Sequence, residues 1–377
     1  MHKLACELRS RHIVQVVTQW NTQRTDWLWG TTIRAPKPAH AYVIDDIPVN
    51  RITLSQKSRW RLLPWVLAYY PLQHWALPQI ANALVDELMP LALNADIVHN
   101  CRAGREGLSY ASFKLARQRD IPFIFTPVHH PRWGGWLHRY YHSLYRQADA
   151  VIALTEAERR ILVSLGVEER KVFVTGMGPV LSQDRDGRRF RETYELGDAP
   201  LVLFIGKKFA YKGVAILLEA AEIVWRYLPQ IRFIFIGPRT TYSRRLFLQV
   251  KDRRILELGE VDLQEKTDAL DACDVFCLPS SQESFGAVFT EAWSLGKPVV
   301  GCDIPAVREV IDDGQDGFVV PRQTSAIAKS LIYLLENDDL KTQMGNHGRN
   351  KVKRRFMWSI LAEKAEQTYQ SVLRGVL

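Results

Sequence analysis

Short apolar runs recur along the first half of the chain, and stretches with the spacing of amphipathic helices lie between them. An apolar run of a few residues bounded by polar positions is typical of a strand that is buried on both faces of a parallel sheet. The first half therefore predicts parallel strands at HIVQVVTQW (12–20), DIVHN (97–101), PFIFTP (122–127), AVIALT (150–155) and KVFVTG (171–176).

A second series of strands follows the polar stretch at 181–200. Its runs are LVLFIG (201–206), RFIFIG (232–237), DVFCLPS (274–280), PVVGCD (298–303) and GFVV (317–320). Between the first two, the spacing predicts a helix with one apolar face formed by Ile216, Leu217, Ala220, Ile223, Val224 and Tyr227.

This alternation predicts an α/β fold with two doubly wound, Rossmann-like domains. We expect residues 1–176 and a returning helix at 356–377 in the first domain, and residues 177–355 in the second. In such folds the ligand binds at the carboxyl ends of the strands, so a cleft facing both domains is the expected site.

Composition narrows the class of protein. The 377 residues are 47% hydrophobic and 24% charged, which is typical of a globular protein. No apolar run reaches the roughly 20 residues that a spanning helix needs. The five cysteines are scattered, which fits a reduced, cytoplasmic protein.

The net charge of +9 lies almost entirely in the first half. Residues 1–175 hold 22 Lys and Arg against 14 Asp and Glu, whereas the remainder holds 28 against 27. The first half also holds eight of the eleven tryptophans. A basic aromatic surface suits an anionic membrane or a nucleic acid, and solvated charges around an aromatic core are the alternative.

The stretch ESFGAVFTE (283–291) carries two carboxylates around a glycine. It follows the predicted strand at 274–280, and a helix is expected from about Ala287 to Leu295. Gly286 would allow close approach of a ligand, and the amides of Gly286, Ala287 and Val288 at the helix start would bind phosphate. Alternatively, Glu283 is an ordinary charge at a helix end and Glu291 is a surface residue.

A second polar segment, IGKKFAYKG (205–213), places two cations at the end of another strand. Lys212 stands at the start of the next helix, where a positive charge opposes the helix dipole. An anionic ligand would explain Lys207 and Lys212, and ordinary surface lysines are the alternative.

Together these segments resemble the family 4 glycosyltransferases, which are retaining enzymes of the GT-B fold. Residues 279–321 follow the family signature, with its paired glutamates at Glu283 and Glu291. Residues 206–213 resemble a second family segment, with Lys207 where arginine is usual. Residues 258–280 are similar to the stretch that frames the nucleotide base.

The resemblance implies a role for each of these residues. Lys207, Lys212 and the amides after Gly286 would neutralise the diphosphate of a nucleotide-sugar donor. Glu291 would accept hydrogen bonds from the donor ribose, and Glu283 would contact the sugar. Fixed positive charge at the leaving diphosphate lowers the barrier to an oxocarbenium-like transition state.

The first half would supply the acceptor side. Its segment FTPVHHPRW (125–133) resembles the family loop that carries a catalytic histidine; His130 is the first choice and His129 the rival. Arg102, Gly104 and Arg105 would face the acceptor, and the segment 356–373 resembles the helix that returns to the first domain.

The resemblance also implies what the enzyme uses. The only D-x-D motif, at 184–186, lies in the polar linker, so we expect a metal-independent hexosyltransferase without a cofactor. The partners would be a nucleotide sugar and a glycan or lipid acceptor of bacterial surface polysaccharide or glycolipid synthesis, with a peripheral contact at the inner membrane face and no nucleic acid.

One departure leaves alternatives open. Family members open with a strand and a glycine-rich loop, whereas this chain begins in the helix that follows them, at MHKLACELRSRH. The first strand of the N-terminal domain is therefore expected to be missing. A truncated, non-catalytic nucleotide-sugar-binding protein is the main alternative, and an epimerase of similar fold is opposed by the paired glutamates.

Overall fold

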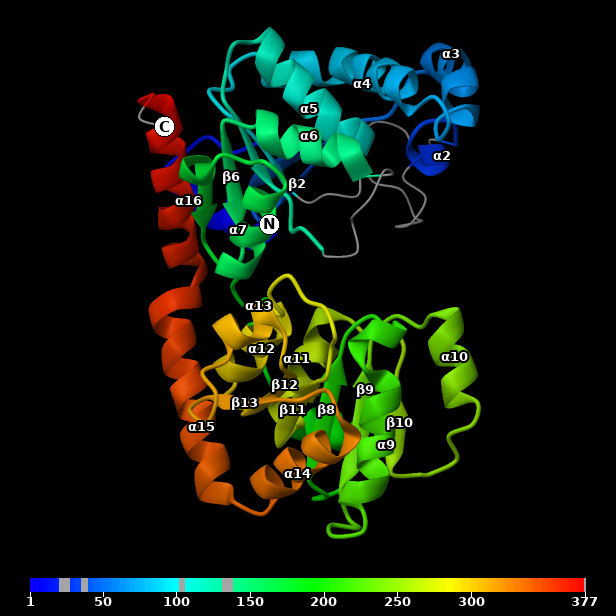
Figure 1. The fold of residues 1–377 in the computed structure, drawn as a ribbon, viewed down its shortest axis with the longest axis vertical. Helices are drawn as coiled ribbons and strands as arrows, with labels where there is room; N and C mark the ends of the chain where they lie inside the picture. The colour runs from blue at the N-terminus through cyan, green and yellow to red at the C-terminus, as the bar shows by residue number, and fades with distance from the viewer. Residues whose placement is uncertain (20–27, 35–39, 102–105, 131–137, 376–377) are drawn as a thin grey trace. The chain divides into compact units, whose positions relative to one another are not determined.

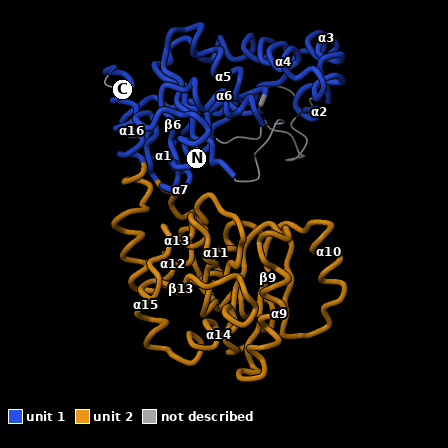
Figure 2. Tube along the Cα trace, in the orientation of Figure 1, with its two compact units in different colours: residues 1–175, 362–377 blue, residues 176–361 orange. Residues whose placement is uncertain are grey.

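The structure, a computed structural model, describes residues 1–19, 28–34, 40–101, 106–130 and 138–375. It divides into two compact units (Figures 1 and 2). Unit 1 contains Met1–Thr175 and Ala362–Leu377, and unit 2 contains Gly176–Leu361. The last helix, α16 (Trp358–Leu373), begins in unit 2 and continues into unit 1. Each unit is described below by itself.

Unit 2 is built on a six-stranded parallel sheet with the order β10-β9-β8-β11-β12-β13. Chain order reverses between β8 and β11, which creates the switch point at which open α/β sheets bind ligands. The strands are β8 (Leu201–Ile205), β9 (Arg232–Ile236), β10 (Ile255–Glu257), β11 (Val275–Leu278), β12 (Val299–Cys302) and β13 (Gly317–Val320). The five apolar runs predicted here are all strands, and β10 is an additional short edge strand in a charged segment that gave no strand pattern.

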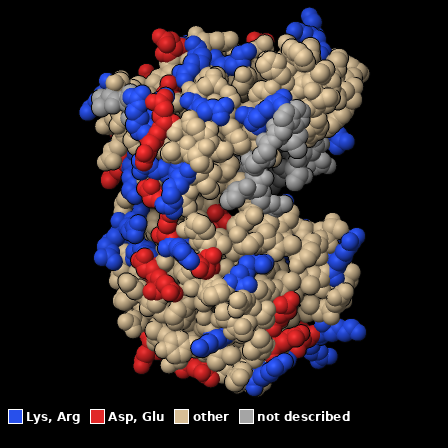
Figure 3. All heavy atoms as spheres, viewed as in Figure 1, with Lys and Arg blue, Asp and Glu red and all other residues tan. Residues whose placement is uncertain are grey.

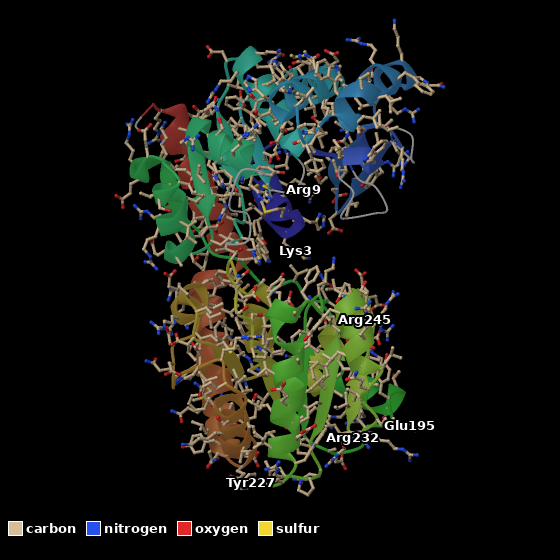
Figure 4. All side chains as sticks on the ribbon, turned by 45° about the vertical axis from the view of Figure 1, so that its right-hand side comes forward. Lys3, Arg9, Glu195, Tyr227, Arg232 and Arg245 are labelled. Carbon is tan, nitrogen blue, oxygen red and sulfur yellow. The ribbon has the colours of Figure 1, made fainter. Side chains whose placement is uncertain are left out.

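Helices cover both faces of this sheet, as the alternating pattern predicts. They are α8 (Gly187–Thr193), α9 (Val214–Val224), α10 (Thr241–Phe247), α11 (Leu263–Ala272), α12 (Ala287–Ser294), α13 (Pro305–Val310), α14 (Thr324–Leu335) and α15 (Asp338–Lys351), with a 3-10 turn η4 (Ala210–Lys212) and a π-helical turn η5 (Val352–Phe356). In α9 the predicted face buries Leu217, Ala220 and Val224. Tyr227 was wrongly included: α9 ends before it, and the residue is 66% exposed (Figure 4).

Unit 1 contains two sheets. One is parallel, with the order β4-β5-β6-β7, and the other has the order β1-β3-β2. Their strands are β1 (Val16–Thr18), β2 (His40–Ile44), β3 (Ile47–Arg51), β4 (Val98–Cys101), β5 (Phe123–Thr126), β6 (Ala150–Ala153) and β7 (Val172–Val174). Among the described residues, β1 pairs only with β3 and β4 only with β5, so each leaves one edge without a partner strand.

The antiparallel pair β2–β3 is a feature that the sequence did not predict. Asp45 and Asp46 form its turn with φ angles of 47° and 57°, a conformation that aspartate tolerates better than most residues. Most of β2 is exposed although residues 41–44 are all apolar. This short apolar run before the two aspartates was the signal that the sequence offered. The predicted strand at 12–20 is also shorter than expected, because only Val16–Thr18 pairs.

The helices of unit 1 pack beside these sheets. They are α1 (His2–Arg9), α2 (Leu28–Thr31), α3 (Gln56–Leu67), α4 (Gln73–Leu88), α5 (Glu106–Gln118), α6 (Arg139–Gln147) and α7 (Glu156–Ser164), with 3-10 turns η1 (Met89–Ala92) and η3 (Glu169–Lys171). A core cluster joins α3, α4 and α5 through residues such as Leu62, Ile80 and Leu115. Over the described ranges, no helix combines the length and the apolar character needed to cross a membrane.

Candidate functional site

The loops after β8 and β11 meet at the switch point of unit 2. The backbone N–H of Ser281 donates to the carbonyl of Tyr211 at 2.8 Å. Gly213, which precedes α9, has a φ of 83°, and a Cβ there would lie 2.2 Å from the carbonyl oxygen of Pro279. Only glycine allows these two loops to approach so closely, and the polar groups of both are therefore brought together.

Lys212 and Glu283 face each other across this junction. The Lys212 Nζ atom lies 2.5 Å from Glu283 Oε1, and their side chains are 17% and 9% exposed. The Ser280 hydroxyl donates to the same carboxylate oxygen at 2.7 Å. Two predicted site residues from different loops thus form one ion pair, which holds a cation at the carboxyl end of the sheet.

Helix α12 begins beside this pair without a side-chain cap. Its N-cap is Gly286, with a φ of 85°. A Cβ there would lie 2.7 Å from the Phe289 ring, so a larger residue would disturb the start of the helix. Ala287 and Val288 are half-buried. Phe289 donates back to the Gly286 carbonyl at 2.9 Å, and the amides before it are oriented as in an anion-binding helix start.

Glu291 is the most informative residue of the site. It lies one turn inside α12 and is only 5% exposed, so the alternative of a surface glutamate is wrong. Its Oε1 atom lies 2.8 Å from Lys266 Nζ and accepts a long, 3.4 Å hydrogen bond from the Val180 amide. Its Oε2 atom is buried and has no hydrogen-bond partner among the described residues.

The environment of Glu291 has two opposed electrostatic effects. Burial raises the pKa of the carboxyl above its usual value, and the neighbouring Lys266 ammonium opposes that rise. A buried acceptor without a partner is rare in folded proteins, because it costs about 1–3 kcal/mol. The Oε2 atom thus lacks the hydrogen-bond donor that a buried carboxylate oxygen normally has.

The two adjacent lysines after β8 differ in their surroundings. Lys208 is fully buried, with Nζ bonded to Glu257 and to the carbonyls of Gly237 and Leu258. Lys207, the residue predicted to bind the donor, is half-buried, and its Nζ lies 4.8 Å from the centre of the Phe209 ring. Lys208 is therefore a structural residue, and only Lys207 is open to a ligand.

Sequence reasoning missed Lys266. It lies in the first turn of α11, where a cation opposes the helix dipole. The same pattern, a positive charge at a helix start, is what drew attention to Lys212. Lys266 Nζ also donates to the Val180 carbonyl at 2.7 Å, so it links α11, α12 and the segment before α8.

Asp186, the second aspartate of the D-x-D motif, caps α8 by accepting from the amides of Arg188 and Arg189.

In unit 1, the two candidate histidines follow β5 and differ in burial. His129 is 4% exposed. Its amide donates to Glu158, and its Nδ1 atom lies 3.2 Å from the Tyr145 hydroxyl. Burial lowers the pKa of His129 to about 4, and the nearby histidines add to this effect. His130 is half-buried.

The backbone before His129 is strained. Val128 has a φ of 50°, which is unfavourable for a β-branched residue by about 1–3 kcal/mol. Glu158 accepts from the amides of both His129 and Leu154 and stabilises this turn. Such strain is common at functional loops.

The predicted acceptor-side residues Arg102, Gly104 and Arg105 lie outside the described residues.

Comparison with known proteins identifies the family. Residues 1–178 match the glycosyl transferase 4-like domain, and residues 187–351 match the glycosyl transferases group 1. A phosphatidyl-myo-inositol mannosyltransferase from Mycobacterium tuberculosis is 35% identical over 178 residues, which are 45% of this chain and 47% of the relative. The capsular polysaccharide glycosyltransferase CapM from Staphylococcus aureus is 25% identical over 60% of this chain and 63% of its own. The alignments thus span about half of the first relative and somewhat more of the second.

Solved structures match the whole chain. Anabaena HepE, crystallised with UDP and glucose, has a TM-score of 0.76 at 18% identity, over 98% of this chain and 94% of its own. Sucrose-phosphate synthase from Thermosynechococcus elongatus has a TM-score of 0.77 at 17% identity, over 99% and 92%. These likenesses show the GT-B fold. With both family domains matched in succession, the chain belongs to the family 4 glycosyltransferases.

Proposed function

We propose that this chain is a retaining glycosyltransferase that moves a sugar from a nucleoside-diphosphate donor to a glycan or lipid-linked acceptor. The observation that carries the proposal is the buried Oε2 atom of Glu291, which has no partner in the described part of the chain. A ribose offers adjacent hydroxyls that donate to such an oxygen. The names of the relatives, which act on a lipid and on capsular polysaccharide, support the acceptor class.

The other residues of the site suit the rest of the donor. When the bond between the anomeric carbon and the diphosphate oxygen breaks, negative charge grows on the leaving phosphate. The Lys212 ammonium, the amides at the start of α12 and Lys207 would stabilise that charge. Glu283, held by Lys212 and Ser280, would orient the sugar. The acceptor oxygen would then bond to the same face of the sugar and give its proton to the leaving phosphate oxygen, so the sugar retains its configuration.

For the catalytic histidine we retain His130. The His129 ring is buried and packs at 5.8 Å, edge to face, against Tyr145, so its role is to support the loop. His130, one residue further from the strained Val128, has the more accessible side chain. It would contact the transferred sugar rather than the phosphates.

A panel of nucleoside-diphosphate sugars tests the proposal. It should include UDP-glucose and a mannose nucleotide, with release of nucleoside diphosphate as the readout. We expect turnover with at least one donor, and loss of that turnover in Glu291→Gln and Lys212→Ala with the fold preserved. The Glu219→Gln variant, on the outer face of α9, is the control and should stay active. Absence of turnover across the panel, with and without lipid acceptors, would contradict the proposal.

A second candidate is binding of a nucleotide sugar without transfer. The unpartnered edges of β1 and β4 favour it, since unit 1 has two separate sheets within its described residues. Both candidates predict binding of nucleoside diphosphates to unit 2. They differ in turnover: the binding protein would hold the intact donor and release no diphosphate.

We also propose a peripheral contact with an anionic membrane through α3 and the start of α4, at the cytoplasmic face. Of the five aromatic residues of this segment, Trp60, Tyr70 and Trp75 are 56–68% exposed. Tyr69 is buried and Trp65 packs against the core, so the core-packing alternative holds for these two. Exposed Lys57 and Arg61 flank Trp60, and no Asp or Glu occurs between Asp46 and Asp86. In Figure 3 the end of unit 1 that carries α3 shows basic and uncharged side chains. Surfaces that combine basic and exposed aromatic side chains bind at the interface of anionic lipid membranes.

Sedimentation with vesicles tests this contact. The protein should bind vesicles that contain an anionic lipid, and the double variant Trp60→Ala/Trp75→Ala should bind them markedly less. Tyr227→Ala is a matched control, because this aromatic is equally exposed but lies in unit 2. Equal binding by the double variant and the control would remove this surface from the account.

A further inference from the structure

Three potential metal ligands converge on one point at the N-terminal edge of unit 1. They are the Nε2 atom of His2, the Sγ atom of Cys6 and a carboxylate oxygen of Asp45. Nε2 lies 2.8 Å from Asp45 Oδ2 and 3.6 Å from Cys6 Sγ, and Sγ lies 3.9 Å from the same Oδ2. Among the described residues, no other group of three such side chains converges in this way.

Local structure explains why these side chains meet. His2 and Cys6 are four residues apart on α1 and therefore lie on the same helical face. Asp45 belongs to the turn between β2 and β3, where its φ of 47° projects the side chain from a tight hairpin. Leu4 and Leu8 occupy the buried face of α1, so the ligand face and the packing face of this helix are separate.

A second contact, between exposed side chains, also joins the helix to the turn. Arg9, one further turn along the same face of α1, pairs with Asp46 at 2.7 Å. Figure 4 labels Lys3 and Arg9 on this helix. Both side chains of this pair are exposed, so the ion pair adds little to the stability of the arrangement.

The distances match a tetrahedral zinc centre. Zinc bonds of about 2.3 Å to sulfur and about 2.0 Å to nitrogen and oxygen give tetrahedron edges of about 3.3–3.6 Å. The distance from Nε2 to Sγ already has this length, and the distance from Sγ to Oδ2 is slightly longer. Only the pair of His2 and Asp45, now at hydrogen-bond distance, must separate by about 0.5 Å to admit the ion.

We propose that His2, Cys6 and Asp45 form a binding site for a borderline-soft divalent cation such as Zn²⁺, with a fourth position open to water. One imidazole, one thiolate and one carboxylate are the ligand types that zinc takes. His2 and Asp45 are 43% and 61% exposed, so the ion enters directly from solvent. Bound there, it links α1 to the β2–β3 turn and stabilises this edge of unit 1. The site is separate from the nucleotide site of unit 2.

Cobalt titration of the metal-free full-length chain tests the site. Co²⁺ bound by a thiolate gives a charge-transfer band in the near ultraviolet, and a tetrahedral centre gives visible bands. We expect both sets of bands to be complete at one equivalent of Co²⁺ per chain. Zn²⁺ should displace the Co²⁺ and should raise the melting temperature of the protein. Cys6→Ser should abolish the charge-transfer band. Mutation of a residue that only supports the metal ligands typically weakens metal binding roughly 10- to 100-fold. His2→Gln and Asp45→Asn each remove a ligand and should weaken Co²⁺ binding by more than this.

The chain supplies matched controls for two of these variants. His12 is as exposed as His2, at 43%, and also pairs with a carboxylate, that of Glu366, at 3.0 Å. Asp46 neighbours Asp45 in the same turn and pairs with Arg9. His12→Gln and Asp46→Asn should bind Co²⁺ as the wild type does. The proposal is overturned if no thiolate band develops, if the band survives Cys6→Ser, or if the controls lose it equally.

Discussion

Glu291→Gln isolates the proposed ribose contact because it changes one charged acceptor with almost no change in volume. A hydrogen bond to a charged group contributes about 1.5–3 kcal/mol, and one between neutral groups about 0.5–1.5 kcal/mol. The difference is about 1–1.5 kcal/mol for each bond. If the carboxylate accepts from both ribose hydroxyls, the variant loses about 2–3 kcal/mol, which is about 30- to 150-fold in Kd.

The cost to the fold should be smaller. Burial raises the pKa of Glu291, so the neutral glutamine removes a charged group that burial disfavours. Lys266 loses its partner, but its side chain is 19% exposed and keeps its bond to the Val180 carbonyl. We therefore expect the melting temperature to change little while nucleotide affinity falls.

Calorimetry with a ribonucleoside diphosphate and its 2′-deoxyribonucleoside counterpart distinguishes a direct contact of Glu291 with the ribose from a general disturbance of the site. The wild type should prefer the ribose form, because the deoxy form lacks one donor to Glu291. In Glu291→Gln that preference should shrink, since the remaining acceptor is neutral. Equal discrimination between the two sugars in wild type and variant would refute the contact, even if both affinities fell.

Three further predictions concern the remaining residues. Lys212→Ala should weaken binding of nucleoside diphosphates about tenfold or more and leave nucleoside binding unchanged in calorimetry, because its ammonium is proposed to bind the phosphates; equal loss for both ligands would contradict this role. His130→Ala should reduce kcat far more than donor affinity, whereas His129→Ala should mainly lower the melting temperature by removing a buried ring; the reverse pattern would exchange the two assignments. Burial raises the pKa of Glu158 to about 7, so its folded form holds the proton more tightly and its stabilising effect is lost as pH rises from about 4.5 to 7. As pH rises across that range, the free energy of unfolding of the wild type should therefore fall by up to about 3 kcal/mol relative to that of Glu158→Gln. Denaturant unfolding of both proteins measures this difference, and a difference that does not change with pH would show that Glu158 keeps an ordinary pKa.

The strands and helix starts of unit 2 could be predicted because their signals are local. Buried apolar runs identify β8, β11 and β12, and all three are fully buried. Gly286 and Gly296 bracket α12 in the sequence, and both have left-handed backbone angles, with φ of 85° and 72°. The ends of this helix follow from glycine's freedom at these two positions.

Contacts between distant segments could not be predicted in this way. Lys266 and Glu291 are 25 residues apart, and no pattern in either helix shows that they pair. Asp45 lies 43 residues from His2, and nothing in the sequence of the β2–β3 hairpin shows that its turn packs against α1. The burial of Glu291 likewise depends on how α11 and α12 pack, which the charged residue itself does not indicate.

Unit 2 is proposed to bind a nucleoside diphosphate through Glu291, Lys212 and the start of α12. A crystal structure of the chain soaked with nucleoside diphosphates tests it most directly. We expect ribose hydroxyls within hydrogen-bond distance of Glu291 Oε2, and the diphosphate against Lys212 and the amides that follow Gly286. A nucleotide bound elsewhere, or a bound nucleotide whose ribose leaves Oε2 without a partner, would contradict it.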